Sequence, residues 1–495
     1  MTSSQIGGIA TLLVTIVSVA LAYRNGKMGH YTTSLWLIFA AGLILRMFAG
    51  ADLHLNPWDE RYHALAAKSL LDHPLTPTLY DDPALDYDYK DWTSSHIWVH
   101  KPPMTLWLIA ASLKVFGVNE IAVRIPSILL SSFGIILIFF ITKYFFDEKT
   151  ALLASFLYAI NGLLIDLMAG HQPTDHPDTI FIFFVGLGVF FSVMYKQRQS
   201  LPTLFLVGVS TGCAVLSKWL PGLLVVAVLF VILLETESWK KSLLRAAIAL
   251  VVAVGVFLPL QIYIYSAFPR EAAWESYFNY RHMFEPLDGH DGTIFYQLAM
   301  MPRIFGELVY LPVGYFFYTL YKKRMRKGMY ALALWFIVPY LFFSFVATKM
   351  PGYVMMSAPP ILMMIAWTFW DAADRLGKLK YRKTAIVALA LLIILPVRYT
   401  IERVKPFSAE ERNPAWAKEL RGLQGCIGWS KAAVFNVEHN IEAMFYARVS
   451  AYPFVPDQHQ IDEAMRRGFR IFVYDDSQLH PELRHNPNVT ILPHQ

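Results

Sequence analysis

The sequence predicts an all-α polytopic membrane protein of roughly twelve spans, followed by a small α/β domain. Of its 495 residues, 56% are hydrophobic and 16% are charged, which leaves too few polar side chains to coat a soluble globule. Sections such as 128–144, 243–265 and 385–397 carry almost no charge, as hydrocarbon about 30 Å thick demands of a helix of about 20 residues. These sections are therefore expected to span a membrane.

Apolar runs recur along the first 400 residues and set the expected number of spans. The first run follows MTSSQIGG, which has no basic residue, so we expect a permanent span there and not a cleaved signal peptide. The runs lie near 6–23, 33–50, 123–146, 151–168, 179–195, 202–217, 220–234, 243–266, 303–321, 329–347, 353–370 and 384–400.

Positive charge in short loops predicts the orientation. The 43 Lys and Arg exceed the 37 Asp and Glu by six, but the bases gather in alternate connections, which is typical of cytoplasmic loops and not of nucleic-acid binding. These connections hold Arg24 and Lys27, Lys196 and Arg198, Lys240 and Lys241, residues 322–327, and residues 375–383. By alternation the outer side receives the loop 51–122, the segments near 171–178, 267–302 and 348–353, and both chain ends.

The tail differs in composition from the rest of the chain. From about Glu402 charged residues become frequent, and AAVFNV, EHNIEAMFYA and FRIFVYDD read as strand, helix and strand. We therefore expect a transmembrane domain over 1–400 and an extracytoplasmic α/β domain over 401–495, which helps with acceptor choice or stability. The two cysteines, Cys213 and Cys426, are expected at different depths, where they cannot form a disulfide.

The first outer loop opens with two acids, Asp59 and Glu60, directly after a span. The residues that follow, in DERYHALAAKSLL, have the spacing of an amphipathic helix at the membrane surface. An acid at a helix N-terminus commonly serves only the helix dipole. The alternative is a carboxylate held for chemistry at the depth of the lipid headgroups.

The same loop ends in HKPP, where Lys101 precedes two prolines that stiffen the chain. A lysine at this place commonly snorkels to the interface. Its functional alternative is a contact for a lipid phosphate.

Other outer connections carry further acids and bases. Convergence of the first outer loop and three further connections on one face favours a single site over separate solvated residues. The candidates are Asp175 beside His171, Arg281 and His282, and Lys349 and Tyr353.

A metal site is weakly indicated. The pattern Asp86-Tyr87-Asp88 can hold a metal that grips a diphosphate, but it lies in an acid-rich run that is more typical of a solvated loop. The need for a divalent metal stays open.

Four motifs together resemble the membrane glycosyltransferases of the GT-C fold, in particular the lipid A aminoarabinose transferases and the protein O-mannosyltransferases. They are D-E-R-Y at 59–62, the KPP-x-x-x-W-L and F-G-x-x-E-x-x-x-R-x-P-S stretch over 101–127, T-D-x-P at 174–177, and K-x-P-x-Y at 349–353. The resemblance covers roughly 52–360.

The resemblance implies a GT-C-like helical bundle and an inverting sugar transfer from a polyprenyl-phosphate lipid to a lipid, glycan or protein. Transfer would take place at the periplasmic or outer face of a membrane, for which a bacterial inner membrane is expected. The implied catalytic residues are Asp59, ranked first, and Asp175. The implied substrate contacts are Glu60, Arg61, Lys101, Arg281, His282, Lys349 and Tyr353.

The residue types alone also suit sugar transfer from a phosphate-linked donor. A phosphate-linked sugar already has a good leaving group, so no acid is needed, unlike in a glycosidase with paired carboxylates. One carboxylate can act as base for a hydroxyl acceptor, and cations such as Lys101, Arg281 and Lys349 can neutralise the departing phosphate. A secondary transporter, which needs polar groups near the midplane and two related halves, is the alternative. An inactive scaffold that binds polyprenyl lipid is a third possibility.

Overall fold

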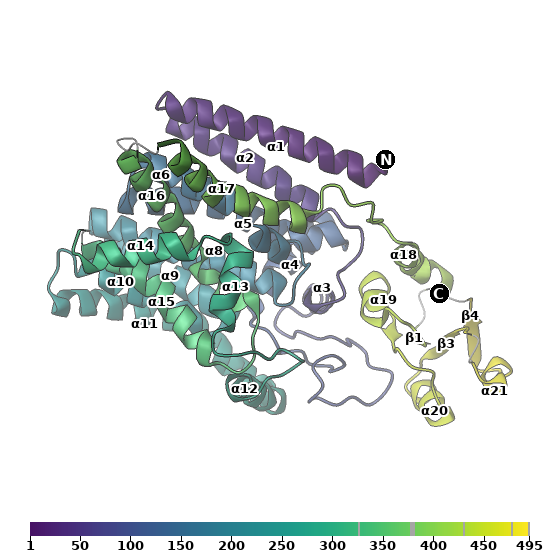
Figure 1. Ribbon diagram of the computed structural model, residues 1–495. Helices are drawn as coiled ribbons and strands as arrows, with labels where there is room; N and C mark the ends of the chain where they lie inside the picture. The colour runs from purple at the N-terminus through teal and green to yellow at the C-terminus, as the bar shows by residue number, and fades with distance from the viewer. Residues whose placement is uncertain (325–326, 377–381, 429–430, 477–478, 494–495) are drawn as a thin grey trace. The chain divides into compact units, whose positions relative to one another are not determined.

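The structure is a computed structural model and describes residues 1–324, 327–376, 382–428, 431–476 and 479–493. Most of these residues are helical (Figure 1). The chain divides into two compact units, described here separately. The first unit contains 1–50, 127–263 and 276–410, and the second contains 51–126, 264–275 and 411–495. The expected cytoplasmic loops at 322–327 and 375–383 lie partly outside the described residues.

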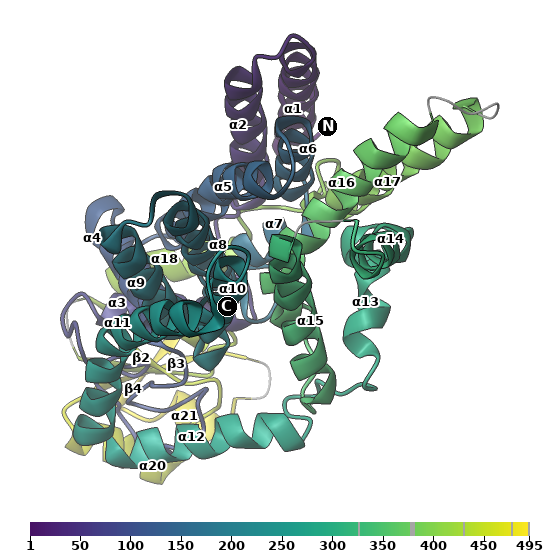
Figure 2. The same ribbon diagram turned by 90° about the vertical axis from the view of Figure 1, so that its left-hand side faces the viewer.

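The first unit is helical throughout its described part. Long apolar helices dominate, joined by short turns, and α1 and α2 form an antiparallel pair (Figure 2). Its elements are α1 (Ser3–Lys27), α2 (Tyr31–Ala49), α6 (Glu148–Ala159), α7 (Gly162–Met168), α8 (Asp175–Arg198), α9 (Leu201–Lys218), η1 (Leu220–Leu223), α10 (Leu224–Leu233), α13 (Tyr296–Phe305), α14 (Tyr310–Tyr321), η2 (Lys327–Met329), α15 (Tyr330–Phe345), η3 (Pro351–Ser357), α16 (Ala358–Leu376) and α17 (Arg382–Val404). Three helices pass from one unit into the other: α5 (Glu120–Phe145), α11 (Trp239–Ala267) and α12 (Pro269–Phe284).

Seven helices within the described residues are long and apolar enough to cross a membrane, or eight if one bent pair counts as a single span. In α1 and α11, only 17% of the apolar window is buried inside the protein. Such exposed apolar surface requires lipid around it. The chain is an integral membrane protein, as predicted.

The bent pair is α6 and α7, whose axes differ by 51°. The sequence indicated one continuous span over 151–168, but the helix breaks before Gly162. The side chain of Asn161 caps the second half by accepting from the backbone N–H of Leu164. The break leaves carbonyl groups at the end of α6 without helical partners.

Arg46 of α2 supplies one of those partners. It is fully buried, and its guanidinium donates to the carbonyl of Ala159, the last residue of α6, at 2.9 Å and to Oγ of Ser131 at 2.8 Å. A buried arginine therefore stabilises the broken helix end.

Glycines let α9 and α11 pack closely. Cβ atoms built at Gly208 and Gly212 would lie 2.7 Å and 2.9 Å from the carbonyl oxygens of Ala249 and Ala253 on α11. This is the small-residue spacing that brings helix backbones together in membranes.

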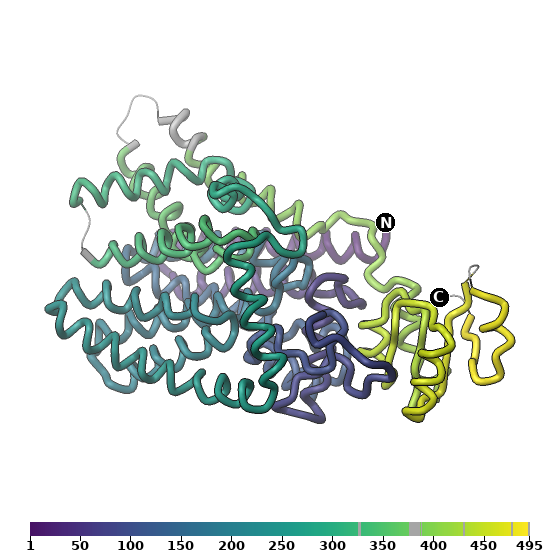
Figure 3. The backbone as a smooth tube through the Cα atoms, turned by 90° about the horizontal axis from the view of Figure 1, so that it is seen from below, coloured from purple at the N-terminus to yellow at the C-terminus, as the bar shows by residue number. Residues whose placement is uncertain are grey.

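The second unit combines the long loop after α2 with residues 264–275 and the tail. Figure 3 shows the two segments running side by side, the loop in blue and the tail in yellow. The helices of the loop are α3 (Asp59–Ser69) and α4 (Pro103–Phe116). The tail contains α18 (Ala415–Ile427), β1 (Ala432–Phe435), α19 (Asn440–Tyr446), β2 (Ser450–Ala451), α20 (Gln458–Arg466), β3 (Arg470–Tyr474), α21 (Pro481–Arg484) and β4 (Val489–Leu492).

The tail strands form a parallel sheet in the order β2-β1-β3-β4. Helices connect successive strands, as parallel pairing requires, and β1, α19 and β3 fall in the stretches read as strand, helix and strand. The sheet is tied to the loop: the hydroxyl of Tyr80 donates to the carbonyl of Ala451, and Tyr452 accepts from the N–H groups of Ala84 and Leu85. The division into a transmembrane domain over 1–400 and an extracytoplasmic α/β domain over 401–495 stays a prediction.

Candidate functional site

Asp59 and Lys101 form an ion pair at the start of α3. Asp59 is the first residue of this helix, where the backbone N–H groups and the helix dipole favour an anion. Lys101 stands just before Pro103, which begins α4. Its Nζ lies 3.5 Å from Oδ2 of Asp59, and the two side chains are 21% and 18% exposed. Both predicted residues are thus adjacent and partly accessible to solvent.

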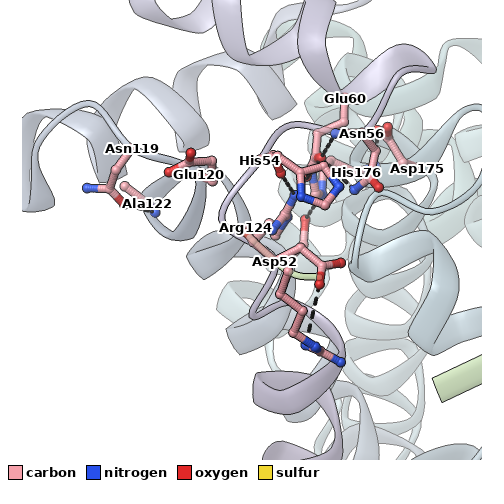
Figure 4. Close-up of polar contacts among 12 residues, drawn as sticks. Asp52, His54, Asn56, Glu60, Asn119, Glu120, Ala122, Arg124, Asp175 and His176 are labelled. Atoms are coloured by element: carbon pink, nitrogen blue, oxygen red, sulfur yellow. Dashed lines mark hydrogen bonds and ion pairs between the residues drawn. The ribbon is translucent and has the colours of Figure 1, made fainter. Parts of the chain in front are cut away.

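Glu60 forms a fully buried ion pair with Arg124 of α5. Nε and Nη2 of the arginine donate to the two carboxylate oxygens at 2.6 Å and 2.7 Å, and Asn56 donates to the same carboxylate (Figure 4). The arginine also donates to the carbonyls of Asp52 and His54. This network fixes the chain that enters α3, so the Glu60 carboxylate is occupied by protein partners while the neighbouring Asp59 is partly exposed.

Arg61 points to the tail. Its Nη1 lies 3.6 Å from Oε1 of Glu442 on α19, and its Nη2 donates to the hydroxyl of Tyr62. Asp59 and Arg61 are two positions apart, so they lie on different faces of α3.

His100, next to Lys101, is held by two partners. Its Nδ1 lies 3.1 Å from both carboxylate oxygens of Glu275, and its ring stacks on Trp92 at 4.6 Å with 7° between the planes. These contacts fix the direction of the HKPP segment and hence the position of Lys101.

Asp175 begins α8 in the first unit. It is fully buried, and Oδ1 accepts from the N–H of His176. The preceding residue, Thr174, has φ +66°, in the left-handed region that a β-branched residue rarely adopts. Strain of this kind is common at functional sites, and here it adjoins a predicted catalytic residue.

Asp178 and Lys218 form a second ion pair near this strained turn. Asp178 also accepts from the hydroxyl of Thr174, and the Lys218 ammonium lies 4.7 Å from the ring centroid of Tyr353. A Cβ at Gly352 of η3 would lie 2.6 Å from Oδ2 of Asp178, so a larger residue at this position would displace the Asp178 carboxylate. The cluster links the predicted Tyr353 to the start of α8.

The remaining predicted residues also lie in the first unit, and each has a local protein partner. Lys349 is buried, and its Nζ donates to the carbonyls of Phe343 and Ser344 at the end of α15. Burial lowers the pKa of Lys349. His282 contacts the hydroxyl of Thr348 at 3.0 Å, while Arg281 pairs with Glu285 one helical turn away.

The acid-rich run shows no metal site. Asp86 pairs with Arg467 of the tail, and Asp88 accepts from the N–H of Lys90. Among the described residues, no three His, Cys, Asp or Glu side chains come together in a way that could hold a metal ion.

Several known proteins are similar to this chain in sequence. A family model described as dolichyl-phosphate-mannose-protein mannosyltransferase matches residues 100–263. The undecaprenyl phosphate-alpha-4-amino-4-deoxy-L-arabinose arabinosyl transferases of Pseudomonas paraeruginosa and Pseudomonas aeruginosa are 27% identical over 64% of this chain. The chain spans about 60% of the length of these curated relatives.

Solved structures extend the likeness. ArnT from Cupriavidus metallidurans bound to undecaprenyl phosphate is similar with a TM-score of 0.59 at 16% identity, over 90% of this chain and 88% of that chain. The archaeal oligosaccharyltransferase AglB from Archaeoglobus fulgidus, in complex with an inhibitory peptide and a dolichol-phosphate, gives a TM-score of 0.58 at 14% identity, over 85% of this chain and 64% of that chain. The chain has the GT-C fold. The resemblance predicted from the four motifs is confirmed.

Several residues of this GT-C chain were not among the sequence-based candidates. Glu120 and Arg124 stand in the quoted F-G-x-x-E-x-x-x-R motif, so the sequence marked these two positions but did not indicate what they do. Asp178 and Lys218 carried no signal beyond their positions at the ends of apolar runs, and Glu442 lies in the tail outside every motif.

Proposed function

We propose that the chain transfers a sugar from a polyprenyl-phosphate lipid to a lipid, glycan or protein acceptor with inversion. The observation that carries the proposal is the Asp59–Lys101 pair, which sets a carboxylate beside a cation at the start of α3 in a chain with the GT-C fold. The arabinosyl transferase relatives and the structure bound to undecaprenyl phosphate support this donor class.

Asp59 is the proposed general base for a hydroxyl acceptor. The acceptor oxygen attacks the anomeric carbon, the bond from that carbon to the phosphate oxygen breaks, and Asp59 takes the proton of the hydroxyl. The phosphate leaves with both electrons of the broken bond. A phosphate acceptor is already ionised, and Asp59 would then only position it.

Lys101 is the proposed phosphate contact nearest the base. An ammonium there stabilises the negative charge that grows on the leaving phosphate. Arg61, Arg281, His282, Lys349 and Tyr353 are kept as proposed substrate contacts, and Asp175 as the second carboxylate. We assign Glu60 a positioning role, because Arg124 and Asn56 already surround its carboxylate.

We further propose that the site faces the periplasmic side of a bacterial inner membrane, with roughly twelve spans and an outer α/β tail. Basic residues in alternate short loops support this orientation. In a variant without Cys213 and Cys426, a cysteine at Lys240 should be protected from a membrane-impermeant thiol reagent, and one at Asp88 should react. The reverse labelling would overturn the orientation.

The activity is tested with purified protein in nanodiscs and a radiolabelled undecaprenyl-phosphate sugar. An enzyme moves label to an acceptor and releases undecaprenyl phosphate. A transporter in sealed vesicles moves label across without breaking the bond, and a scaffold only binds the lipid. Absence of transfer with aminoarabinosyl, mannosyl and other pentosyl donors, despite a folded protein, would reject the proposed function.

A further inference from the structure

Within the second unit, α3, α19 and the first residues of α5 are joined in a closed ring of polar contacts. The first contact is the buried pair between Glu60 of α3 and Arg124 of α5. The second joins α5 to α19, because the Tyr446 hydroxyl donates to Oε1 of Glu120 at 2.5 Å. The third returns to α3 through Glu442 and Arg61. Each helix thus gives one residue to each of its two neighbours.

The spacing of these residues suits a ring. Glu120 and Arg124 are four positions apart on α5, as are Glu442 and Tyr446 on α19, so each pair shares one helix face. Glu60 and Arg61 are consecutive, so they leave α3 in different directions, one toward each partner helix. Arg421 of α18 adds a second donor to Glu120 at 2.6 Å.

The third contact is buried on the tail side. Glu442 is only 1% exposed at its side chain, and no hydrogen-bond donor among the described residues reaches its Oε2. Burial raises the pKa of Glu442, and the nearby Arg61 opposes this shift. The charge of the Glu442 carboxylate is therefore stabilised by Arg61, and the same contact holds the Arg61 side chain in place.

Lys68 holds the C-terminal end of α3 against α19. Its Nζ donates to the carbonyls of Met444, Phe445 and Ala447, where α19 ends. Arg61 and Lys68 are seven positions apart, two turns along one face of α3. A helix held at two points on one face cannot rotate about its axis, and its first residue is Asp59.

We propose that Glu442 and Tyr446 are positioning residues: through the ring they fix the start of α3 and thereby the carboxylate of Asp59 beside Lys101. This inference rests on the proposed function. It gives the tail an indirect part in bond making, through α3: within the described part of the chain, Glu442 is paired with Arg61 and Tyr446 with Glu120, while Asp59 is paired with Lys101.

The test uses Glu442→Gln and Tyr446→Phe, which keep the size of each side chain. Tyr80→Phe is the matched control: it also removes one buried hydroxyl that ties the loop to the tail, at Ala451 and at Asn440, the first residue of α19, but at no residue of the ring. Per folded molecule, the ring variants should lower kcat roughly three- to tenfold, the effect of about one hydrogen bond, with the donor KM unchanged. The control should retain wild-type kcat.

A double-mutant cycle separates positioning from general loosening. If the ring acts through Asp59, adding Tyr446→Phe to Asp59→Asn should cause little further loss. If the fold-losses in kcat of the two single variants multiply in the double variant, the inference is overturned. Equal losses in kcat for Tyr446→Phe and Tyr80→Phe would overturn it as well.

Hydrogen exchange gives a readout without turnover. Tyr446→Phe should speed exchange of the amides of the first turn of α3, residues 60–63, while Tyr80→Phe should not. Unchanged exchange there would overturn the inference even if the wild type proved inactive with every donor. If Tyr446→Phe speeds this exchange but the wild type transfers no sugar from any donor, the role of the ring in fixing α3 is supported and the proposed function is rejected.

Discussion

Lys101 Nζ lies 3.5 Å from Oδ2 of Asp59, and this contact joins the HKPP segment to the start of α3. The carboxylate sits on the first residue of a helix whose second residue is held by a buried ion pair. The proposed base and the proposed phosphate contact stand on different segments of the chain, so their effects on the reaction can be measured separately.

Asp59→Asn should lower the transfer rate to a hydroxyl acceptor by about 10² to 10⁴, because removal of a general base costs that much. Donor affinity should change little, since the amide keeps the size of the side chain. Steady-state kinetics with the purified variant measures both. Asp72→Asn, on the same loop and exposed, is the matched control. A near wild-type rate with a hydroxyl acceptor would exclude Asp59 as base, whereas survival only with a phosphate acceptor indicates that no base is needed.

Lys101→Ala should weaken donor-dependent activity more than Lys101→Arg. Arginine keeps the positive charge, although its planar fork differs in geometry from an ammonium. The expected signature is a higher donor KM together with a lower kcat in the alanine variant, and partial recovery of both in the arginine variant. Equal activity of Lys101→Ala and wild type would remove Lys101 from the site.

Asp175→Asn should reduce transfer less than Asp59→Asn. Asp175 is fully buried at the start of α8, next to the strained Thr174, and we expect it to position neighbouring groups. The two variants should be compared at saturating donor and acceptor in the same preparation. A larger loss in Asp175→Asn would reverse the proposed ranking of the two carboxylates.

Arg124→Met should destabilise the second unit by about 3 to 5 kcal/mol, because it leaves the buried Glu60 carboxylate without its cation. Thermal unfolding in detergent measures the effect. Arg448→Met, which changes an exposed arginine of the same unit, should leave the unfolding temperature within error of wild type. Wild-type stability of Arg124→Met would mean that water or another cation replaces the arginine.

Lys68 should give the protein a pH-dependent stability. Burial lowers its pKa to about 8, from 10.5 in the unfolded chain. Between these values the unfolded chain binds more protons at this residue, so the free energy of unfolding should rise with pH. Below pH 8 both states are protonated, and the residue gives no slope. Unfolding temperatures from pH 7.5 to 9.5 should show this rise in wild type and in the exposed-lysine control Lys90→Met, but not in Lys68→Met. Parallel curves for all three proteins would contradict it.

Hydropathy predicted most of the helices, because lipid imposes long apolar runs on any span. It did not predict the break between α6 and α7. Residues 151–168 are apolar on both sides of Asn161, so the average shows one span where the backbone makes two helices.

Neighbouring acids could not be told apart from sequence. Asp59 and Glu60 stand side by side in D-E-R-Y, yet the first is partly exposed beside Lys101 and the second is fully buried against Arg124. Only three-dimensional packing decides between them. For the same reason no pattern linked Arg61 to Glu442, since the partners lie in segments separated by most of the chain.

The contact between Arg46 and the broken end of α6 has a consequence for how the chain enters the membrane during synthesis. Arg46 and Ala159 are 113 residues apart in the chain, which at roughly 5 to 20 residues per second is a delay of roughly 6 to 23 s. Throughout that interval the helix that carries the arginine exists without the carbonyl that later accepts from it. Arg46 lies in the last turn of α2, so during that interval its long side chain can reach the polar edge of the bilayer. The buried contact therefore forms only after α6 has been made, and the arginine has to leave the polar edge of the bilayer to form it.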